Sequence, residues 1–334
     1  MKTWKLVVPA LVIPLWLCSC REGSDPAGPP APPPIPNRPH RIALFKMGGD
    51  SNLEDIPVNS LKQGMKLFQF HEGDYYSLKI IDLKGDLDSF PNKLDETIRD
   101  KIDLIVITHP QILQAAMARE VQRPIVFAIL GDPLVLGAGA SAERHRSGLT
   151  GSYNPLPAYS LLAMVKYYLP HAKRVGVVFR GGEPLSVAHK DALIRDSPRA
   201  QLEIVAVESA ASEDPTVATD QLFPRAIDAI CLVVGLGQSS SGVIEWAARA
   251  KLPVFGFEEA QVRGGSLAAE VPIADRVGLE AGRMAYRVLS GERTDDIPFA
   301  QIIDTEAIVN TKAVEGLAIT LPPGALRNSR IVTE

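Results

Sequence analysis

The chain has 334 residues, of which 46% are hydrophobic, and this is enough for two ordinary domains with cores of their own. Its formal net charge is −4 at pH 7, the charges form no blocks, and only 6% of the residues are aromatic. This composition argues against the electrostatic footprint and the stacking platforms of a nucleic-acid-binding protein.

Residues 1–20 have the pattern of an export signal. A positively charged start precedes the apolar run Leu6–Leu17, which is shorter than the roughly 20 residues that a membrane-spanning helix needs. The run ends in Leu17-Cys18-Ser19-Cys20, which resembles the bacterial lipobox. That resemblance implies cleavage before Cys20 and a lipid anchor on it. The alternative is an ordinary signal peptide whose cysteines are incidental.

Residues 21–40 form a proline-rich linker, and its stretch SDPAGPPAPPPIPNRP indicates an extended, semi-rigid spacer. Of the three cysteines, only Cys231 lies beyond this region. It falls in an apolar run over 229–234, which predicts a buried strand thiol and leaves the mature chain without a disulfide. An exported protein with a large core does not need one.

The first half of the chain alternates between strand and helix patterns. Strands are predicted at 41–45, 75–81, 104–107 and 125–129, and helices at 56–70, at 94–101 and, after an exit loop at 108–111, through residue 120. A glycine-rich segment over 131–151 is expected to lack regular structure. This alternation predicts parallel βαβ units.

The second half repeats the pattern. Strands are predicted at 174–179, 202–207, 229–234 and 253–257, and helices at 158–169, from 185 and after 240. A further strand at 266–271, a helix at 276–290 and a strand at 299–309 follow. The residues alone therefore predict two similar halves.

The boundary between the halves carries a family resemblance. A strand with the letters PIVF is followed by GDP, a glycine-rich loop and LTG, and then by YLPHAKRVGVVF, which begins at Tyr168. Together with KLPVF at 251–255 and IVN at 308–310, this order resembles bacterial ABC-transporter substrate-binding proteins of the tryptophan/tyrosine-binding type. The resemblance implies an α/β fold of two Rossmann-like lobes with parallel sheets joined by a multi-crossover hinge, the type I periplasmic-binding-protein fold.

The resemblance also sets the expected domain limits. Residues 41–152 and 266–297 are assigned to the first lobe, and residues 153–265 and 298–312 to the second. Residues 313–334 are expected to form a C-terminal tail packed on the lobes.

The candidate ligand contacts are polar residues that follow predicted strands, because ligands of open α/β sheets bind beyond the carboxyl ends of strands. They are Asp50, Ser51, Thr108 and Asp132 in the first lobe, and Glu183, Ser186, Gln238 and Glu258 in the second. For Asp132, a purely structural role in an Asp-Pro turn is an equal alternative. We expect His109 to be a surface loop histidine.

Glu183 and Ser186 match a family pattern in which Arg180 replaces the usual Asn. An arginine at this place either pairs with a ligand carboxylate in a bidentate manner or lies solvated in the loop, and the loop interpretation is preferred. Glu258 stands where the family often has Asp.

No catalytic motif is present: the chain lacks a G-x-S-x-G nucleophile elbow, and its histidines have no metal-ligand spacing. We expect no enzyme activity, no metal and no cofactor. The predicted function is that of an extracytoplasmic, lipid-anchored binding protein of an ABC importer. It would hold a small organic solute, with an amino acid as one candidate, and work with an ABC permease and no nucleic acid. The alternatives are a ligand-binding module of a sensor kinase or chemoreceptor and, disfavoured by the missing motif, an exported α/β hydrolase.

Overall fold

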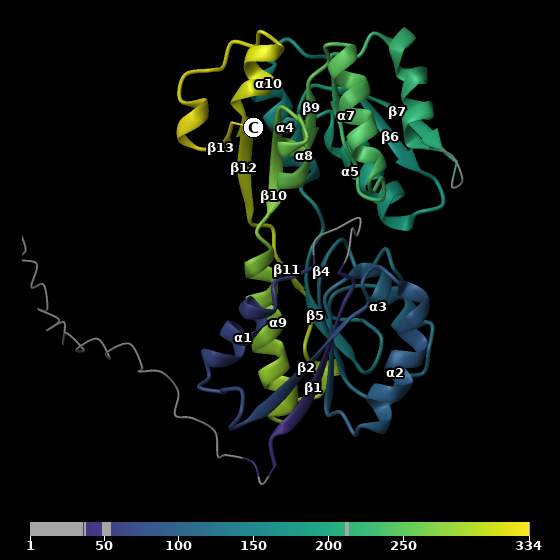
Figure 1. Ribbon diagram of the computed structural model, residues 1–334, viewed down its shortest axis with the longest axis vertical. Coiled ribbons are helices and arrows are strands. Elements are labelled where there is room, and N and C mark those ends of the chain that lie inside the picture. The colour runs from purple at the N-terminus through teal and green to yellow at the C-terminus, as the bar shows by residue number, and fades with distance from the viewer. Residues whose placement is uncertain (1–35, 37, 49–54, 211–213, 334) are drawn as a thin grey trace, which may run out of the picture.

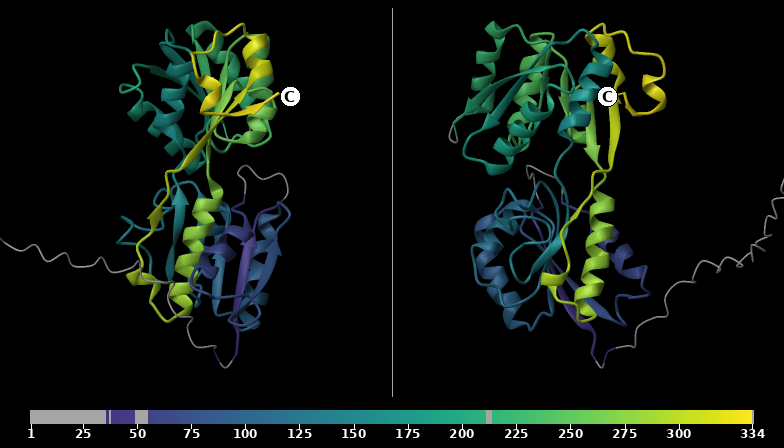
Figure 2. Two further views of the ribbon diagram at one scale, coloured as in Figure 1. Left: turned by 90° about the vertical axis from the view of Figure 1, so that its left-hand side faces the viewer. Right: turned by 180° about the vertical axis from the view of Figure 1, so that it is seen from behind.

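The computed structural model describes residues 36, 38–48, 55–210 and 214–333. The predicted export segment with Cys20, most of the linker, and Asp50 and Ser51 lie outside the described residues. The described chain forms two lobes stacked end to end, with the connections between them gathered in one place (Figures 1 and 2). The predicted α/β architecture of two mostly parallel sheets is confirmed.

The sheet of the first lobe has six strands in the order β11-β5-β4-β3-β1-β2, and all neighbours are parallel. The strands are β1 (His40–Lys46), β2 (Tyr76–Asp82), β3 (Leu104–Ile107), β4 (Ile125–Leu130), β5 (Leu149–Asn154) and β11 (Ala300–Gln301). β3 and β4 are buried along their whole length, as the continuous apolar runs of a doubly covered parallel sheet require.

The first three residues of β5, Leu149–Gly151, lie at the end of the segment that the sequence analysis expected to lack regular structure, and for these residues that expectation was wrong. The sequence of β5, LTGSYN, is polar and yet fully buried. The strand tolerates this because Thr150 Oγ1 donates to the Ile297 carbonyl at 2.7 Å and Ser152 Oγ donates to the Val277 carbonyl at 2.6 Å. Each buried hydroxyl thereby recovers the hydrogen bond it loses to water.

Helices cover both faces of this sheet (Figure 1). They are α1 (Val58–Lys66), η1 (Leu87–Ser89), α2 (Phe90–Arg99), α3 (Pro110–Met117), α9 (Ala274–Leu289) and η3 (Thr294–Asp296). α1 and α9 pack on one face in a core that includes Ile42 and Leu44. α2 and α3 pack on the other in a core that includes Ala43 and Phe45, so successive β1 residues serve opposite layers.

The second sheet has seven strands in the order β13-β12-β10-β9-β8-β6-β7, and only the pairing of β10 with β12 is antiparallel. The strands are β6 (Arg174–Arg180), β7 (Glu203–Ser209), β8 (Ala229–Cys231), β9 (Val254–Gly256), β10 (Ala268–Pro272), β12 (Thr305–Asn310) and β13 (Arg330–Val332). The helices are α4 (Ala158–Tyr168), α5 (Pro184–Asp196), α6 (Pro215–Thr219), η2 (Asp220–Arg225), α7 (Ser239–Arg249), α8 (Glu259–Arg263), α10 (Thr311–Gly316) and η4 (Ala325–Arg327). Cys231 is fully buried, and burial raises the pKa of its thiol.

The lobe limits differ from the expected ones in two places. The sequence analysis gave 266–297 to the first lobe, but β10 pairs with β9 and β12 of the second sheet, and only α9 and η3 return. It also expected one strand over 299–309 in the second lobe. Instead, β11 adds to β5 in the first sheet and β12 joins the second. The residues after β12 stay with the second lobe, where β13 pairs with β12.

Three crossovers join the lobes: β5 to α4, β10 to α9, and β11 to β12. They are also bonded to one another. The Asp304 carbonyl accepts hydrogen bonds from Ile273 N at 3.0 Å and from Asn154 Nδ2 at 3.4 Å. The third crossover therefore contacts both of the others, so the three strands of the hinge form one connected unit.

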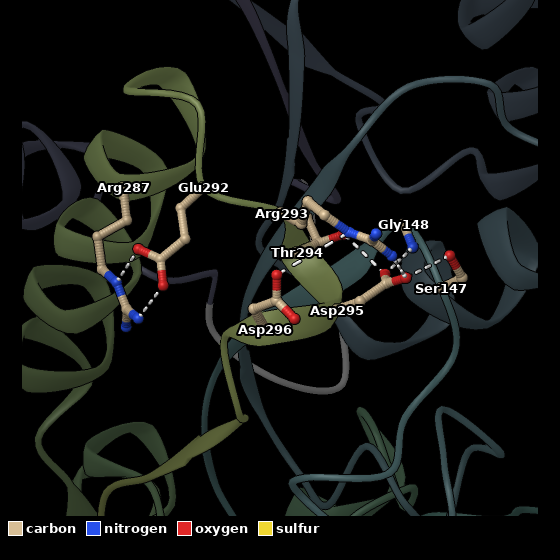
Figure 3. A network of polar contacts seen from close by, with 8 residues as sticks. All are labelled: Ser147, Gly148, Arg287, Glu292, Arg293, Thr294, Asp295 and Asp296. Atoms are coloured by element: carbon tan, nitrogen blue, oxygen red, sulfur yellow. Dashed lines mark hydrogen bonds and ion pairs between the residues drawn. The ribbon is translucent and has the colours of Figure 1, made fainter.

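At the far end of α9 the chain turns back through a polar network (Figure 3). Arg287 pairs with Glu292 just beyond the helix, and the Asp295 carboxylate accepts bonds from Gly148 N at 3.0 Å and Ser147 Oγ at 2.9 Å. The backbone N–H of Gly148 is the main cause that lowers the pKa of Asp295 to about 2. The network fastens the returning segment to the start of β5.

In the described part of the chain, no helix combines the length and apolarity needed to cross a bilayer.

The contact between α1 and α9 depends on glycine and yields a test. A Cβ at Gly282 would lie 2.1 Å from the Leu61 carbonyl oxygen, and a Cβ at Gly64 would lie 2.1 Å from the Leu279 carbonyl oxygen. Gly→Ala in an open helix gains up to about 1 kcal/mol of helix propensity, but forcing helices apart costs about 1–3 kcal/mol.

We therefore expect Gly282→Ala to lower the melting temperature and the free energy of unfolding. Gly316→Ala is the control, because a Cβ there meets nothing within 4 Å. Urea unfolding of both variants checks this, and equal stability of the two would refute the close-packing argument.

Candidate functional site

The topology turns the carboxyl ends of the strands in both sheets toward the space between the lobes. β5 ends at Asn154 and leads directly into α4 of the second lobe, while β10 ends at Pro272 and leads directly into α9 of the first. The strands β1, β3 and β4 run parallel to β5, and β6, β8 and β9 run parallel to β10. All six therefore end at the interlobe edge, where ligands of such sheets bind.

Two cavities lie along this edge, and they share no lining residue. The larger, of about 770 Å³, is a groove beside the hinge and includes Asp132 from the first lobe and Leu185 from the second. The smaller, of about 300 Å³, lies on the second lobe between the loops that follow β6 and β8. Of the candidate residues, Asp132 lines the larger cavity, and Glu183 and Gln238 line the smaller one.

Asp132 lines the groove, and its Oδ1 accepts a hydrogen bond from Leu134 N at 2.9 Å. This bond is the turn interaction that the sequence suggested for an Asp before Pro. The turn also brings the lobes together, because a Cβ at Gly131 would lie 2.9 Å from Leu185 Cδ1. Asp132 therefore has a structural bond and also a place at an interlobe cavity.

Thr108 is buried, with 1% of its surface exposed, and its hydroxyl lies 3.0 Å from Asp55 Oδ1 and 3.2 Å from the Phe45 carbonyl. Asp55 also accepts bonds from Met47 N and Gly48 N, at 3.0 and 2.7 Å. The Thr108 hydroxyl hydrogen is therefore committed within the lobe. Asp55, which the sequence analysis did not single out, links the end of β1 to the end of β3.

His109 is also buried, with 1% of its surface exposed, so the expectation of a surface loop histidine was wrong. It is the N-cap of α3, and its Nδ1 accepts a bond from Gln111 N at 3.3 Å. Burial lowers its pKa to about 4, against the opposing charge of Asp55. The ring is therefore neutral at pH 7 and carries its hydrogen on Nε2.

The second-lobe candidates divide by role. Glu183 and Gln238 line the smaller cavity. Ser186 is fully buried, and its Oγ accepts a bond from the backbone N of Arg180 at 3.1 Å. Ser186 thus holds the loop after β6, while Arg180 itself lines the cavity. This position favours the cleft-facing interpretation of Arg180 over the solvated loop that was preferred from the sequence.

Glu258 lines neither cavity. Its side chain and that of Gln261 form a capping box at the start of α8, in which each side chain bonds the other residue's backbone N–H. The carboxylate is therefore turned toward its own helix. The spacing of Glu258 and Gln261 in the sequence already carried this signal. Among the described residues, no group of three His, Cys, Asp or Glu side chains is placed to hold a metal ion.

His189 lines the larger groove beside the hinge and was not predicted. It is 3% exposed, its Nδ1 accepts a bond from Val234 N at 3.4 Å, and its ring meets Phe257 edge-on at 5.4 Å. Burial lowers its pKa to about 4. The side chain therefore supports the segment that leads into the loop after β8.

A pH dependence of stability follows from His189. Its folded pKa is below the unfolded value near 6.5, so the folded state binds fewer protons and the histidine's contribution is complete above pH 6.5 and lost as the pH falls toward 4. Between pH 7.5 and pH 5, we expect the free energy of unfolding to fall by about 2 kcal/mol more in the wild type than in His189→Gln. Urea unfolding at both pH values measures this. His71→Gln, at an exposed histidine, is the control, and an unchanged pH dependence in His189→Gln would contradict the assignment.

Comparison with known proteins agrees with this geometry. The model of the family described as ABC transporter substrate binding protein matches residues 48–331. A tyrosine-binding protein of Clostridioides difficile (strain R20291) is 26% identical over 250 residues, which cover 74% of this chain and 72% of the relative.

Solved structures share the fold. The ABC domain in complex with L-Trp from Streptococcus pneumoniae superposes with a TM-score of 0.76 at 18% identity, covering 88% of this chain and 100% of the other. A ligand-free, open substrate binding protein with adhesive properties from Clostridium difficile gives 0.71 at 23% identity, covering 88% and 99%. Because the family match spans both lobes and the hinge, the chain belongs to the ABC transporter substrate-binding protein family.

Proposed function

We propose that this chain is the extracytoplasmic solute-binding protein of an ABC importer and that it closes its two lobes around a small organic solute. The observation that carries the proposal is the family match across residues 48–331, on a fold whose strand ends meet between hinged lobes. Proteins of this family bind solutes and interact with a membrane permease, and they are not enzymes. Closure around the solute would present both lobes to that permease.

An amino acid is the first solute class to consider. The curated relative is a tyrosine-binding protein, and one solved neighbour holds L-Trp. The described residues at the interlobe edge supply the matching chemistry, because carboxylates and a guanidinium lie at the ends of strands. An amino acid offers an ammonium and a carboxylate to such groups.

The lipid anchor belongs to the same proposal. β1 begins at the end of the first lobe that lies away from the second lobe (Figure 1). A chain tethered through Cys20 and the proline-rich linker would enter the folded domain there, which leaves the interlobe edge and the second lobe turned away from the tether.

The binding proposal predicts a thermal shift. A solute that binds only the folded state stabilises it by about 2.7 kcal/mol when present at 100 times its Kd. We expect at least one of the 20 L-amino acids, tested with L-tyrosine and L-tryptophan first, to raise the melting temperature, with calorimetry giving the Kd. If no amino acid and no related small solute in a broad panel shifts the melting temperature, the proposed function is wrong.

The anchoring proposal predicts a labelling result. Cys20→Ala should abolish incorporation of labelled fatty acid, because Cys231 is the only cysteine left after cleavage and it is buried. Cys18→Ala, two residues away, is the matched control and should be labelled as the wild type is. Equal labelling of the wild type and Cys20→Ala would exclude the lipobox interpretation.

A further inference from the structure

The 300 Å³ cavity of the second lobe is built from two loops. Arg180, Gly182 and Glu183 follow β6, and Gly235–Ser239 follow β8. Gly235 and Gly237 have φ values of +90° and +58°, a backbone conformation that favours glycine. The loop after β8 lines the cavity with two glycines and with the uncharged residues Leu236, Gln238 and Ser239, so the charged groups of the cavity come from the loop after β6.

The two charged residues of that loop are held three positions apart. Glu183 N donates to the Arg180 carbonyl at 3.2 Å, and Ser186 Oγ accepts from Arg180 N at 3.1 Å. Both residues are half-buried. A tight turn thus fixes a cation and an anion at the border of one small cavity.

Glu183 is the N-cap residue of α5, but its side chain makes no capping bond to that helix in the described structure. Glu183 is one of the two charged residues that line the cavity, and its carboxylate does not serve as a cap of its own helix in the described structure.

Arg180 has a carboxylate beside it. The pKa of Asp214 is lowered chiefly by the hydrogen bond from Thr216 N, and the charge of Arg180 adds to this effect. A guanidinium carries five N–H donors in a planar fork, so it can contact a fixed carboxylate and a second one at the same time. The guanidinium can therefore contact a solute carboxylate while it stays near Asp214.

We propose that this cavity recognises the zwitterionic head of an amino acid, with Arg180 binding the α-carboxylate and Glu183 the α-ammonium. The proposal rests on the proposed function and deepens it, because it assigns the head group to the second lobe. The solute's side chain then points to the first lobe. In this assignment, Arg180 is the residue that makes a carboxylate part of the solute's required chemistry.

The test compares the protein with head-group derivatives. The probes are L-tyrosine, L-tyrosinamide, which lacks the carboxylate, and N-acetyl-L-tyrosine, which lacks the ammonium. The same three forms of any amino acid that binds more tightly make a second set. Calorimetry on the wild type should show a loss of roughly 10- to 100-fold in affinity for each derivative, as expected for a charged hydrogen bond.

The variants identify which residue reads which group. Arg180→Ala should weaken amino-acid binding and bring the amino acid and its amide to within roughly threefold, while still discriminating against the N-acetyl form. Glu183→Gln should also weaken amino-acid binding. It should bring the amino acid and its N-acetyl form to within roughly threefold in affinity, while still discriminating against the amide. Arg180→Lys keeps the charge but loses the planar fork, so its discrimination should fall between wild type and Arg180→Ala.

The control is Arg249→Ala, at an exposed arginine in the last turn of α7 of the same lobe, which should bind all three probes as the wild type does. Melting temperatures without solute establish that each variant is folded. If the wild type binds an amino acid but Arg180→Ala still discriminates against the amide as strongly, the head-group assignment is wrong and the binding function stands. If the wild type binds no amino acid in any form, the zwitterion assignment is wrong, and the broad solute panel then decides whether the binding function also falls.

Discussion

The structure depends on one topological constraint, which is that every crossover leaves a sheet at the carboxyl ends of its strands. β5 and β10 both end at the hinge, and nine of the other strands run parallel to one or the other through unbroken ladders. This arrangement gathers the strand ends of both lobes at one edge without any requirement on their sequence. Loops at this edge can carry binding residues, because loops at the ends of a rigid sheet are not needed for its core.

The hinge must join the lobes firmly and still let them move. Its three crossovers are bonded together at Asp304, through Ile273 N and Asn154 Nδ2, so they should bend as a unit and not as independent links. The interlobe contact of Gly131 with Leu185 lies close by. A groove lined by residues of both lobes and of the hinge must change shape whenever the lobe angle changes, because no rigid motion of two bodies preserves a cavity that both of them line.

Much of the fold could be predicted from the sequence because buried parallel strands are apolar throughout, as β3 and β4 are. β5 was not predicted, because its burial depends on hydrogen bonds from the Thr150 and Ser152 hydroxyls to segments more than 120 positions away. No local sequence pattern indicates such distant partners. The sequence also did not predict that 299–309 divides into two strands, for a related reason. β11 belongs to the first sheet because it pairs with β5, and this pairing joins residues far apart in the chain.

The candidate site shows the same division between local and distant causes. The strand exits were found, but a polar residue at an exit can serve its own turn or helix, as Glu258 does in its capping box, or bridge two strands, as Thr108 does through Asp55. Position alone does not separate these roles from solute binding. What separates them is whether the side chain's hydrogen-bonding capacity is already used within the lobe.

In the loop after β6, neighbouring residues have different surroundings. Ser186 uses its hydroxyl on the backbone of Arg180 and is fully buried, so it acts as a support. Glu183 and Arg180 stay half-buried beside a cavity. The support and the groups that it supports lie within seven residues of one another. Because the bond between Ser186 Oγ and Arg180 N involves only the backbone of residue 180, it does not depend on which side chain that residue carries.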